Sequence, residues 1–340
     1  MTGSQMPALH RRVFLARAAA VGAASYLPLP RIASAEPPPE ITHIRFMHSP
    51  SICTAPQYVA EQLLRSEGFS DVSYVRAAST AEFAESVADG RADFGVKTAP
   101  YLIPQLDAER RIVVLSGLHA GCYELFAHEH IRTISDLKGK TLAVSEFNSS
   151  EHVFISSMVA YVGMDPRNDI RWLTARTTAN AMQLFIEGKA DAFLAFPPEP
   201  QELRARKIGR VILDTTLDRP WSQYFCCMVF ANREFVVRNP ITAKRTLRAI
   251  FKAADICAVD PESAARYLVT KGYEPRYEIG LEVLKSLPYA RWRESDPEDT
   301  LRFHALRLHE AGMIKSSPQK LIAQGTDWRF LNELKKELKA

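Results

Sequence analysis

The strongest constraint on the fold of this chain is a segment that occurs twice. Residues 86–94 read SVADGRADF and residues 185–193 read FIEGKADAF, so that Gly90 and Gly188 stand 98 positions apart (188 − 90 = 98). In both copies a helical stretch ends at the glycine, a basic residue follows, and an aspartate opens an apolar strand that runs into proline. Glycine suits the left-handed residue at which many helices end, because it has no Cβ. Two copies of one α/β unit predict two similar lobes.

The apolar periodicity around the repeat alternates between strand and helix. It predicts strands at residues 41–47, 71–75, 92–96, 112–116 and 142–144, and helices at residues 55–67, 80–89 and 151–162. Strands separated by helices imply parallel sheets with helices on both faces. We expect the chain to cross between the lobes at residues 122–127 and 224–230, and the spacing is helical from residue 233 onward.

The composition is that of a globular protein, and its charge excludes one class of partner. Hydrophobic residues make up 46% of the 340 positions and charged residues 24%. The first 35 residues hold four arginines and no acid, which leaves 43 − 4 = 39 basic residues against 39 acidic ones in the rest of the chain. The chain after residue 35 is therefore neutral overall, which gives no electrostatic reason to expect binding to nucleic acid. We predict no nucleic-acid partner.

The first 35 residues are typical of an export signal. The segment RRVFL at residues 11–15 resembles the twin-arginine motif, although His10 stands where Ser or Thr is usual. The apolar run at residues 16–29 is too short to span a bilayer, and an Ala-Ser-Ala cleavage site ends at Ala35. We therefore expect a periplasmic protein whose signal is cleaved near Ala35. The alternative is that this segment is an amphipathic first helix of the fold.

The cysteines do not form a pattern typical of disulfides or metal sites. Five are present: Cys53, Cys122, Cys226, Cys227 and Cys257. An odd count at irregular spacing is no disulfide framework, and neither CxxC nor a histidine spacing typical of zinc occurs. We expect the cysteines to be small buried hydrophobic residues and predict that no disulfide is needed for folding. We also expect no metal and no cofactor.

Several segments together resemble a known family. They are DGRAD at residues 89–93, ISDLKGKT at 134–141, EGKAD at 187–191, and Arg233-Glu234-Phe235 followed by Asn239-Pro240. The chain resembles, over nearly all of its mature length, the nitrate/sulfonate/taurine-type solute-binding proteins of ABC transporters. These include relatives of pyrimidine-precursor binders and synthases.

The resemblance implies an α/β structure of the type II periplasmic-binding-protein fold. Two α/β lobes are then joined by two crossing hinge strands and followed by a helical C-terminal extension, with the ligand between the lobes. We expect lobe 1 to comprise residues 41–125 plus 228–340, and lobe 2 to comprise residues 126–227. The shared segments are structural, so they identify the fold better than the ligand.

Candidate site residues follow from the rule that ligands bind beyond the carboxyl ends of strands in open α/β sheets. Small polar side chains follow the strand ends, and the N-terminus of the helix at 151–162 can hold an anionic or strongly polar ligand. The candidate ligand-binding residues are Ser51, Cys53, Lys97, Thr98, Ala99, Glu124, Glu146, Ser149, Ser150, His152, Pro197, Glu199 and Tyr224. Simpler roles stay open, since the serines can be helix caps, His152 a first-turn residue and Tyr224 a packing residue.

The candidate residues place more carboxylates than cations in the cleft. The basic residues of the expected cleft are Lys97 and His152, and its acidic residues are Glu124, Glu146, Glu151 and Glu199. A buried nitrate or sulfonate needs paired donors, so a nitrogen-containing organic ligand suits this set better.

We predict a monomeric binding protein, not an enzyme, that captures a small organic or oxyanion-like nitrogen or sulfur compound and delivers it to an ABC permease. Two alternatives are a pyrimidine-precursor-synthase-like enzyme, whose cysteine-rich segment Cys226-Cys227 loosely matches, and a periplasmic ligand sensor.

Overall fold

In the computed structural model, which describes residues 36–338, the alternating strands form two five-stranded sheets. Both sheets lie in one compact unit, Pro38–Ala340. The expected export signal at residues 1–35 falls outside the described residues. Within the described part of the chain, no helix is long and apolar enough to cross a bilayer.

The first sheet has the strand order β2-β1-β3-β10-β4. Its strands are β1 (His43–Met47), β2 (Asp71–Val75), β3 (Phe94–Thr98), β4 (Ile112–Ala120) and β10 (Phe225–Asn232). The second sheet has the order β7-β6-β8-β5-β9. Its strands are β5 (Glu124–Ala127), β6 (Thr141–Val144), β7 (Arg171–Thr174), β8 (Ala192–Ala195) and β9 (Arg210–Asp214).

The expected parallel pairing is present in both sheets, but each sheet also contains antiparallel pairs and is therefore mixed. Strands β1, β2 and β3 pair in parallel, as do β6, β7 and β8. In contrast, β10 runs antiparallel to β3 and β4, and β5 runs antiparallel to β8 and β9. The antiparallel strands are those by which the chain enters each sheet from the other one, so they need no helical crossover of their own.

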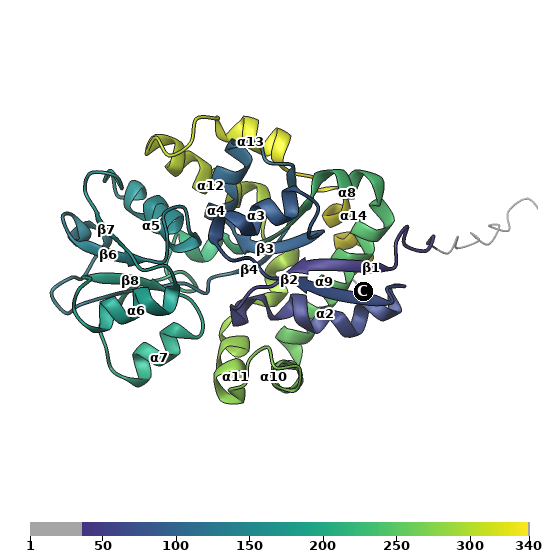
Figure 1. Ribbon diagram of the computed structural model, residues 1–340, viewed down its shortest axis with the longest axis horizontal. Coiled ribbons are helices and arrows are strands. Elements are labelled where there is room, and N and C mark those ends of the chain that lie inside the picture. Colours follow the sequence, from purple (N-terminus) through teal and green to yellow (C-terminus); the bar gives the residue numbers. More distant parts are fainter. Residues whose placement is uncertain (1–35, 339–340) are drawn as a thin grey trace, which may run out of the picture. The chain divides into compact units, whose positions relative to one another are not determined.

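The two sheets are covered by equivalent helices, as the repeated segment predicts (Figure 1). Those of the first half are α2 (Ala55–Ser66), α3 (Thr80–Ala88) and α4 (Ala99–Asp107). Those of the second half are α5 (Ser150–Tyr161), α6 (Thr178–Ile186) and α7 (Glu199–Ala205). Figure 1 shows α5, α6 and α7 beside strands β6, β7 and β8, in teal.

The repeated residues have the same structural roles in both halves. Gly90 and Gly188 follow α3 and α6 with φ of 73° and 71°, as expected for glycines that end helices. The carboxylate of Asp93 accepts the backbone N–H of Arg45 at 2.8 Å, and the carboxylate of Asp191 accepts that of Thr141 at 2.8 Å. Each aspartate therefore ties the start of its own strand to the neighbouring parallel strand.

The two connections between the sheets are hydrogen-bonded to each other. The chain passes from β4 to β5 through residues 121–123 and returns from β9 to β10 through residues 215–224. Tyr123 N–H donates to Thr215 Oγ1 at 2.9 Å, and Thr215 N–H donates to the carbonyl oxygen of Tyr123 at 2.9 Å. A Cβ on Gly121, whose φ is +76°, would lie 2.4 Å from Thr216 Oγ1. The remaining residues of the two expected crossing stretches belong to β5 and β10.

The C-terminal region is helical, as expected. Its helices are α8 (Arg233–Arg238), α9 (Pro240–Val259), α10 (Pro261–Thr270), α11 (Tyr277–Ser286), α12 (Pro297–Glu310), α13 (Pro318–Gly325) and α14 (Arg329–Glu337). Helix α9 packs along α2, and α12 contacts both α4 of the first half and α5 of the second. The C-terminal extension therefore packs against helices of both halves.

Candidate ligand-binding cleft

Two adjoining cavities lie between the carboxyl ends of the two sheets. The larger cavity has a volume of about 540 Å³ and the smaller one about 120 Å³. They share lining residues from both halves: Pro50, Thr80, Lys97, Ser145, Thr178 and Phe196. The cavities therefore form one cleft, and the larger cavity is within the usual size of small-molecule sites.

Strand ends and helix starts supply the polar lining of the cleft. Lys97 and Thr98 end β3, and Ser145 follows β6. Thr80 and Thr178 are the first residues of α3 and α6. The free N–H groups at such helix starts favour an electronegative ligand group.

Two hydroxyl groups in the smaller cavity have no partner. Thr98 Oγ1 and Ser150 Oγ are buried, and neither forms a hydrogen bond with any described residue. A buried hydroxyl left unpaired costs about 1–3 kcal/mol, so native proteins rarely leave one without a partner. Both residues line the same small cavity, and a bound molecule there could hydrogen-bond to both.

The ammonium group of Lys97 lies beside aromatic rings and a carboxylate. Its Nζ is 4.5 Å from the ring centre of Phe83 and 5.4 Å from that of Tyr101. Burial lowers the pKa of Lys97, while the nearby carboxylate of Glu151 acts in the opposite direction. A ligand acceptor beside Lys97 Nζ would therefore stabilise the charged form of this side chain.

The acidic residues of the cleft are not equivalent. Burial raises the pKa of Glu199 to about 8, although its Oε2 accepts the backbone N–H of Phe196 at 3.0 Å. Glu199 is therefore mostly protonated at neutral pH and could donate a hydrogen bond. Glu151 instead accepts the backbone N–H of Ser145 at 2.9 Å and also the Ser145 hydroxyl.

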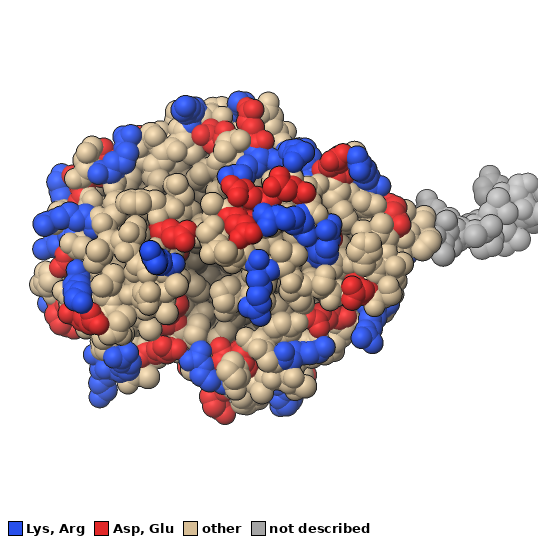
Figure 2. Space-filling model, in the orientation of Figure 1, with Lys and Arg blue, Asp and Glu red and all other residues tan. Residues whose placement is uncertain are grey.

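Two hydrogen bonds join the walls of the cleft. Thr80 N–H of the first half donates to Glu146 of the second at 3.4 Å. The Ser51 hydroxyl donates to the carbonyl oxygen of Pro197 at 3.4 Å. Figure 2 shows that Lys and Arg alternate with Asp and Glu over the viewed face, without a broad patch of one sign. On this face, therefore, no patch of one sign surrounds the cleft.

The structure brings part of the expected site together. The candidate residues that line the cavities are Ser51, Cys53, Lys97, Thr98, Glu146, Ser150 and Glu199. The candidate residues that do not line them are Ala99, Glu124, Ser149, His152, Pro197 and Tyr224.

The residues outside the cavities have other partners. Glu124 forms an ion pair with Arg204. Ser149 Oγ accepts the backbone N–H of His152 at 3.2 Å and so caps α5. Tyr224 stacks on Phe303 with ring centres 4.2 Å apart. These side chains are engaged with the fold and not with the cleft.

The other three are also held by the protein. The ring centre of His152 lies 4.5 Å from that of Trp172, and its Nδ1 accepts the backbone N–H of Asn148 at 3.1 Å. Ala99 begins α4 and is completely buried. Pro197 contributes only its carbonyl oxygen, which accepts the Ser51 hydroxyl.

Sequence reasoning missed Arg76, Thr80, Arg176 and Thr178, all of which line the larger cavity. Extending the repeat toward the N-terminus at the same offset of 98 aligns Ser79-Thr80 with Thr177-Thr178. Ser79 and Thr177 are the N-caps of α3 and α6. That extension would have placed both threonines at helix starts facing the cleft.

The chain is similar to several known proteins. A family model described as "NMT1/THI5 like" matches residues 52–264. The periplasmic nitrate-binding protein NrtA from Synechocystis PCC 6803 has a TM-score of 0.75 and 16% identity, covering 89% of this chain and 90% of that one. The alkanesulfonate-binding protein SsuA from Xanthomonas axonopodis pv. citri bound to MOPS has a TM-score of 0.68 and 17% identity, covering 87% and 100%. At this identity the likeness concerns the fold.

A curated relative at low identity has an enzyme name. The Saccharomyces cerevisiae (strain ATCC 204508 / S288c) protein named 4-amino-5-hydroxymethyl-2-methylpyrimidine phosphate synthase THI13 is 26% identical over 212 residues, which is 57% of this chain and 60% of the relative. The chain thus spans less than two thirds of the length of this relative.

Proposed function

Since the chain belongs to the NMT1/THI5-like family, we propose that it is an extracytoplasmic solute-binding protein of an ABC importer. It captures a small polar organic compound in the cleft and delivers it to a permease. The proposal includes export by the signal at residues 1–35 into the periplasm, and action as a monomer. We place the two lobe boundaries in the connections at residues 121–123 and 215–224, because the expected boundaries after residues 125 and 227 would divide β5 and β10.

The observation that carries this proposal is the pair of unpaired buried hydroxyls in the smaller cavity. Thr98 comes from the first half and Ser150 from the second. A ligand that bonds to both hydroxyls contacts both halves at once. Contacts from both halves favour the closed arrangement, so closure follows from differential affinity.

The cleft supports a ligand with an electronegative group and an organic body. Arg76 and Arg176 supply positive charge, and Lys97 supplies a further donor. A ligand oxygen or ring nitrogen could accept from them, and the organic body could pack against Phe196 and Tyr123. A small oxyanion-like nitrogen or sulfur compound also fits this donor set. The two arginines make the cleft more cationic than the sequence indicated.

The connections at residues 121–123 and 215–224 are the proposed hinges. They join the two sheets, and they are hydrogen-bonded to each other. Hinge closure needs only a few residues to absorb the backbone change. The cross-cleft bond from Thr80 to Glu146 is one contact that opening would break.

Native mass spectrometry tests the proposal directly. Protein purified from the periplasm of its own host is sprayed under native conditions, and any retained small molecule is identified. We expect one retained compound, and small-angle scattering should show a more compact protein when that compound is added back to stripped protein. Turnover of the compound without compaction would favour the synthase-like alternative, which the low-identity yeast relatives suggest. Binding and compaction without uptake through a permease would favour a sensor.

A further inference from the structure

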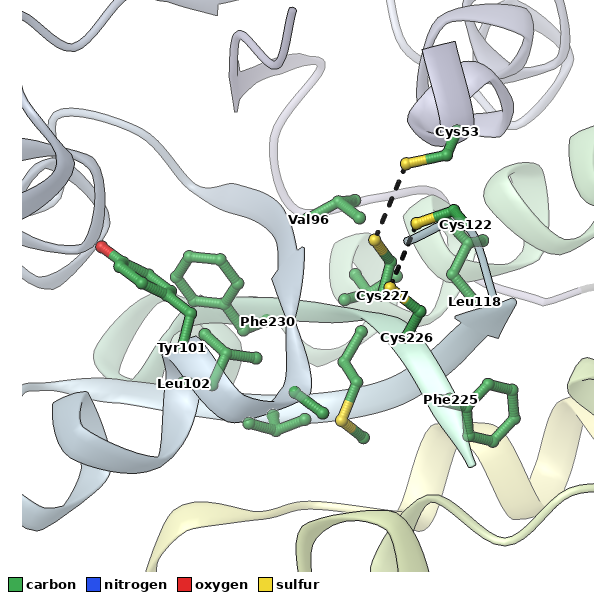
Figure 3. Close-up of a cluster of buried hydrophobic side chains, with 14 of the residues drawn as sticks. Cys53, Val96, Tyr101, Leu102, Leu118, Cys122, Phe225, Cys226, Cys227 and Phe230 are labelled. Carbon is green, nitrogen blue, oxygen red and sulfur yellow. Dashed lines mark hydrogen bonds between the residues drawn. The ribbon is translucent and has the colours of Figure 1, made fainter. Parts of the chain in front are cut away.

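Three cysteines and a histidine from distant parts of the chain gather beneath the smaller cavity. Cys53 lies in the 3₁₀ turn after β1, His119 near the end of β4, Cys122 in the first connection and Cys227 in β10. Their sulfur atoms and one histidine ring nitrogen all lie within 4.8 Å of one another, and all four residues are buried. Figure 3 shows the cysteine side chains converging from separate elements.

The histidine ring of this cluster has an unsatisfied nitrogen. His119 Nδ1 lies 3.1 Å from the carbonyl oxygen of Ala120, to which an Nδ1–H can donate. The other nitrogen, Nε2, is buried and has no hydrogen-bond partner in the described chain. A backbone carbonyl that holds Nδ1–H is the usual second-shell partner of a histidine that binds a metal through Nε2. In the tautomer that donates from Nδ1, Nε2 has a free lone pair.

The sulfur atoms are spaced for a shared ion. Cys53 Sγ and Cys227 Sγ lie 3.9 Å apart. A tetrahedral zinc ion with Zn–S bonds of about 2.3 Å places its sulfur ligands about 3.8 Å apart. The Ser51 hydroxyl lies 3.0 Å from Cys53 Sγ. A metal-bound cysteine is a thiolate, so on metal binding the Ser51 hydroxyl could donate its one proton to Cys53 Sγ in place of the Pro197 carbonyl oxygen.

We propose that Cys53, His119, Cys122 and Cys227 bind one tetrahedral, borderline-soft metal ion such as Zn²⁺. Three thiolates and one imidazole are a common structural zinc set, and four protein ligands leave no open position for catalysis. Binding releases the protons of the three thiols. The site does not depend on the proposed transport role.

The ion would fix the start of the connection between the sheets. Cys122 has a φ of +97°, which few residues other than glycine adopt, and it directly follows Gly121. Its three partners all belong to the part of the chain that builds the first sheet. A bond from Cys122 to a shared ion would hold the first residues of the connection against that sheet.

One neighbouring contact offers a competing chemistry. Cys122 Sγ lies 3.1 Å from Cys226 Sγ. In an oxidising compartment these two thiols could instead form a disulfide by exchange with an oxidant disulfide, which would remove one metal ligand. The His119 nitrogen without a partner is the observation that favours the metal.

The test measures metal content and ligand type in the full chain. Protein is purified anaerobically from zinc-supplemented cells, and zinc per chain is measured by mass spectrometry. We expect one equivalent, and replacement by Co²⁺ should give thiolate-to-metal charge-transfer absorption. His119→Gln and Cys227→Ser should each weaken Zn²⁺ binding by at least roughly 100-fold. Loss of a residue that only hydrogen-bonds to a metal ligand lowers metal affinity by about 10- to 100-fold, and loss of a ligand itself should cost more.

Cys257→Ser is the matched control. Cys257 is a completely buried cysteine in α9 outside the cluster, so its replacement removes one buried thiol and should leave the zinc content unchanged. If the cluster variants fold poorly, the Co²⁺ spectrum of the unaltered protein decides.

Three outcomes would overturn the proposal. The first is that the unaltered protein binds no zinc and its Co²⁺ form shows no charge-transfer absorption. The second is that both cluster variants keep their full zinc content. The third is that the purified protein contains a Cys122–Cys226 disulfide.

Discussion

Thr98→Val tests whether the smaller cavity is the binding site. Valine has nearly the shape of threonine but lacks the hydroxyl, so the change isolates one group. Thr98 Oγ1 is buried and unpaired, and Thr98 makes no side-chain capping bond to α4. The unliganded protein should therefore lose little or no stability, within about 0.5 kcal/mol, because no native hydrogen bond is removed.

Ligand affinity should fall. A neutral hydrogen bond contributes about 0.5–1.5 kcal/mol, which corresponds to a roughly 2- to 12-fold weaker Kd. Isothermal titration calorimetry with the compound retained in native mass spectrometry measures this change, and urea denaturation of the stripped protein measures stability.

Thr246→Val is the matched control. Thr246 in α9 is also completely buried, its Oγ1 also lacks a partner within the described chain, and it lines neither cavity. This variant should share the small stability effect and bind normally. The reasoning fails if Thr98→Val binds as tightly as the unaltered protein, or if Thr246→Val weakens binding equally.

Three further predictions follow from single residues or pairs. Because burial raises the pKa of Glu199 from 4.5 to about 8, the folded protein holds a proton between these pH values that the unfolded chain releases. This contribution to the free energy of unfolding is complete below pH 4.5 and is lost as the pH rises through about 8. Urea denaturation should therefore show that the free energy of unfolding declines across this window, and that Glu199→Gln makes the decline shallower. An unchanged decline in the variant would show that other groups cause it. Replacing Arg11 and Arg12 by lysine should leave precursor in the cytoplasm, seen by fractionation and immunoblotting, and undiminished export would remove the twin-arginine assignment. Thiol titration of denatured, unreduced, metal-free protein should count close to five thiols, since all five cysteines are free; a count of three would indicate a pair, with Cys122 and Cys226 the nearest partners.

The sequence alone predicted the features that depend on local interactions. The turns at Gly90 and Gly188 require a left-handed residue, and both have positive φ. The repeat predicted equivalent helices on two sheets, because helix ends and apolar strands are determined within a few residues. The strand-end rule also selected Thr98 and Ser150, which line the smaller cavity, since Thr98 ends β3 and Ser150 begins the helix that follows β6.

The tertiary structure decided which distant residues meet. Cys53 and Cys227 are separated by 174 positions, and their irregular spacing gave no sign of a shared site. They meet because β10 returns to the first sheet beside β3, an antiparallel placement that the alternating pattern did not predict. Strand order and register are determined by packing between whole elements, and they also decide which side chains face the cleft. Glu124 begins β5 and Tyr224 ends the second connection, yet their side chains contact Arg204 and Phe303 and line neither cavity.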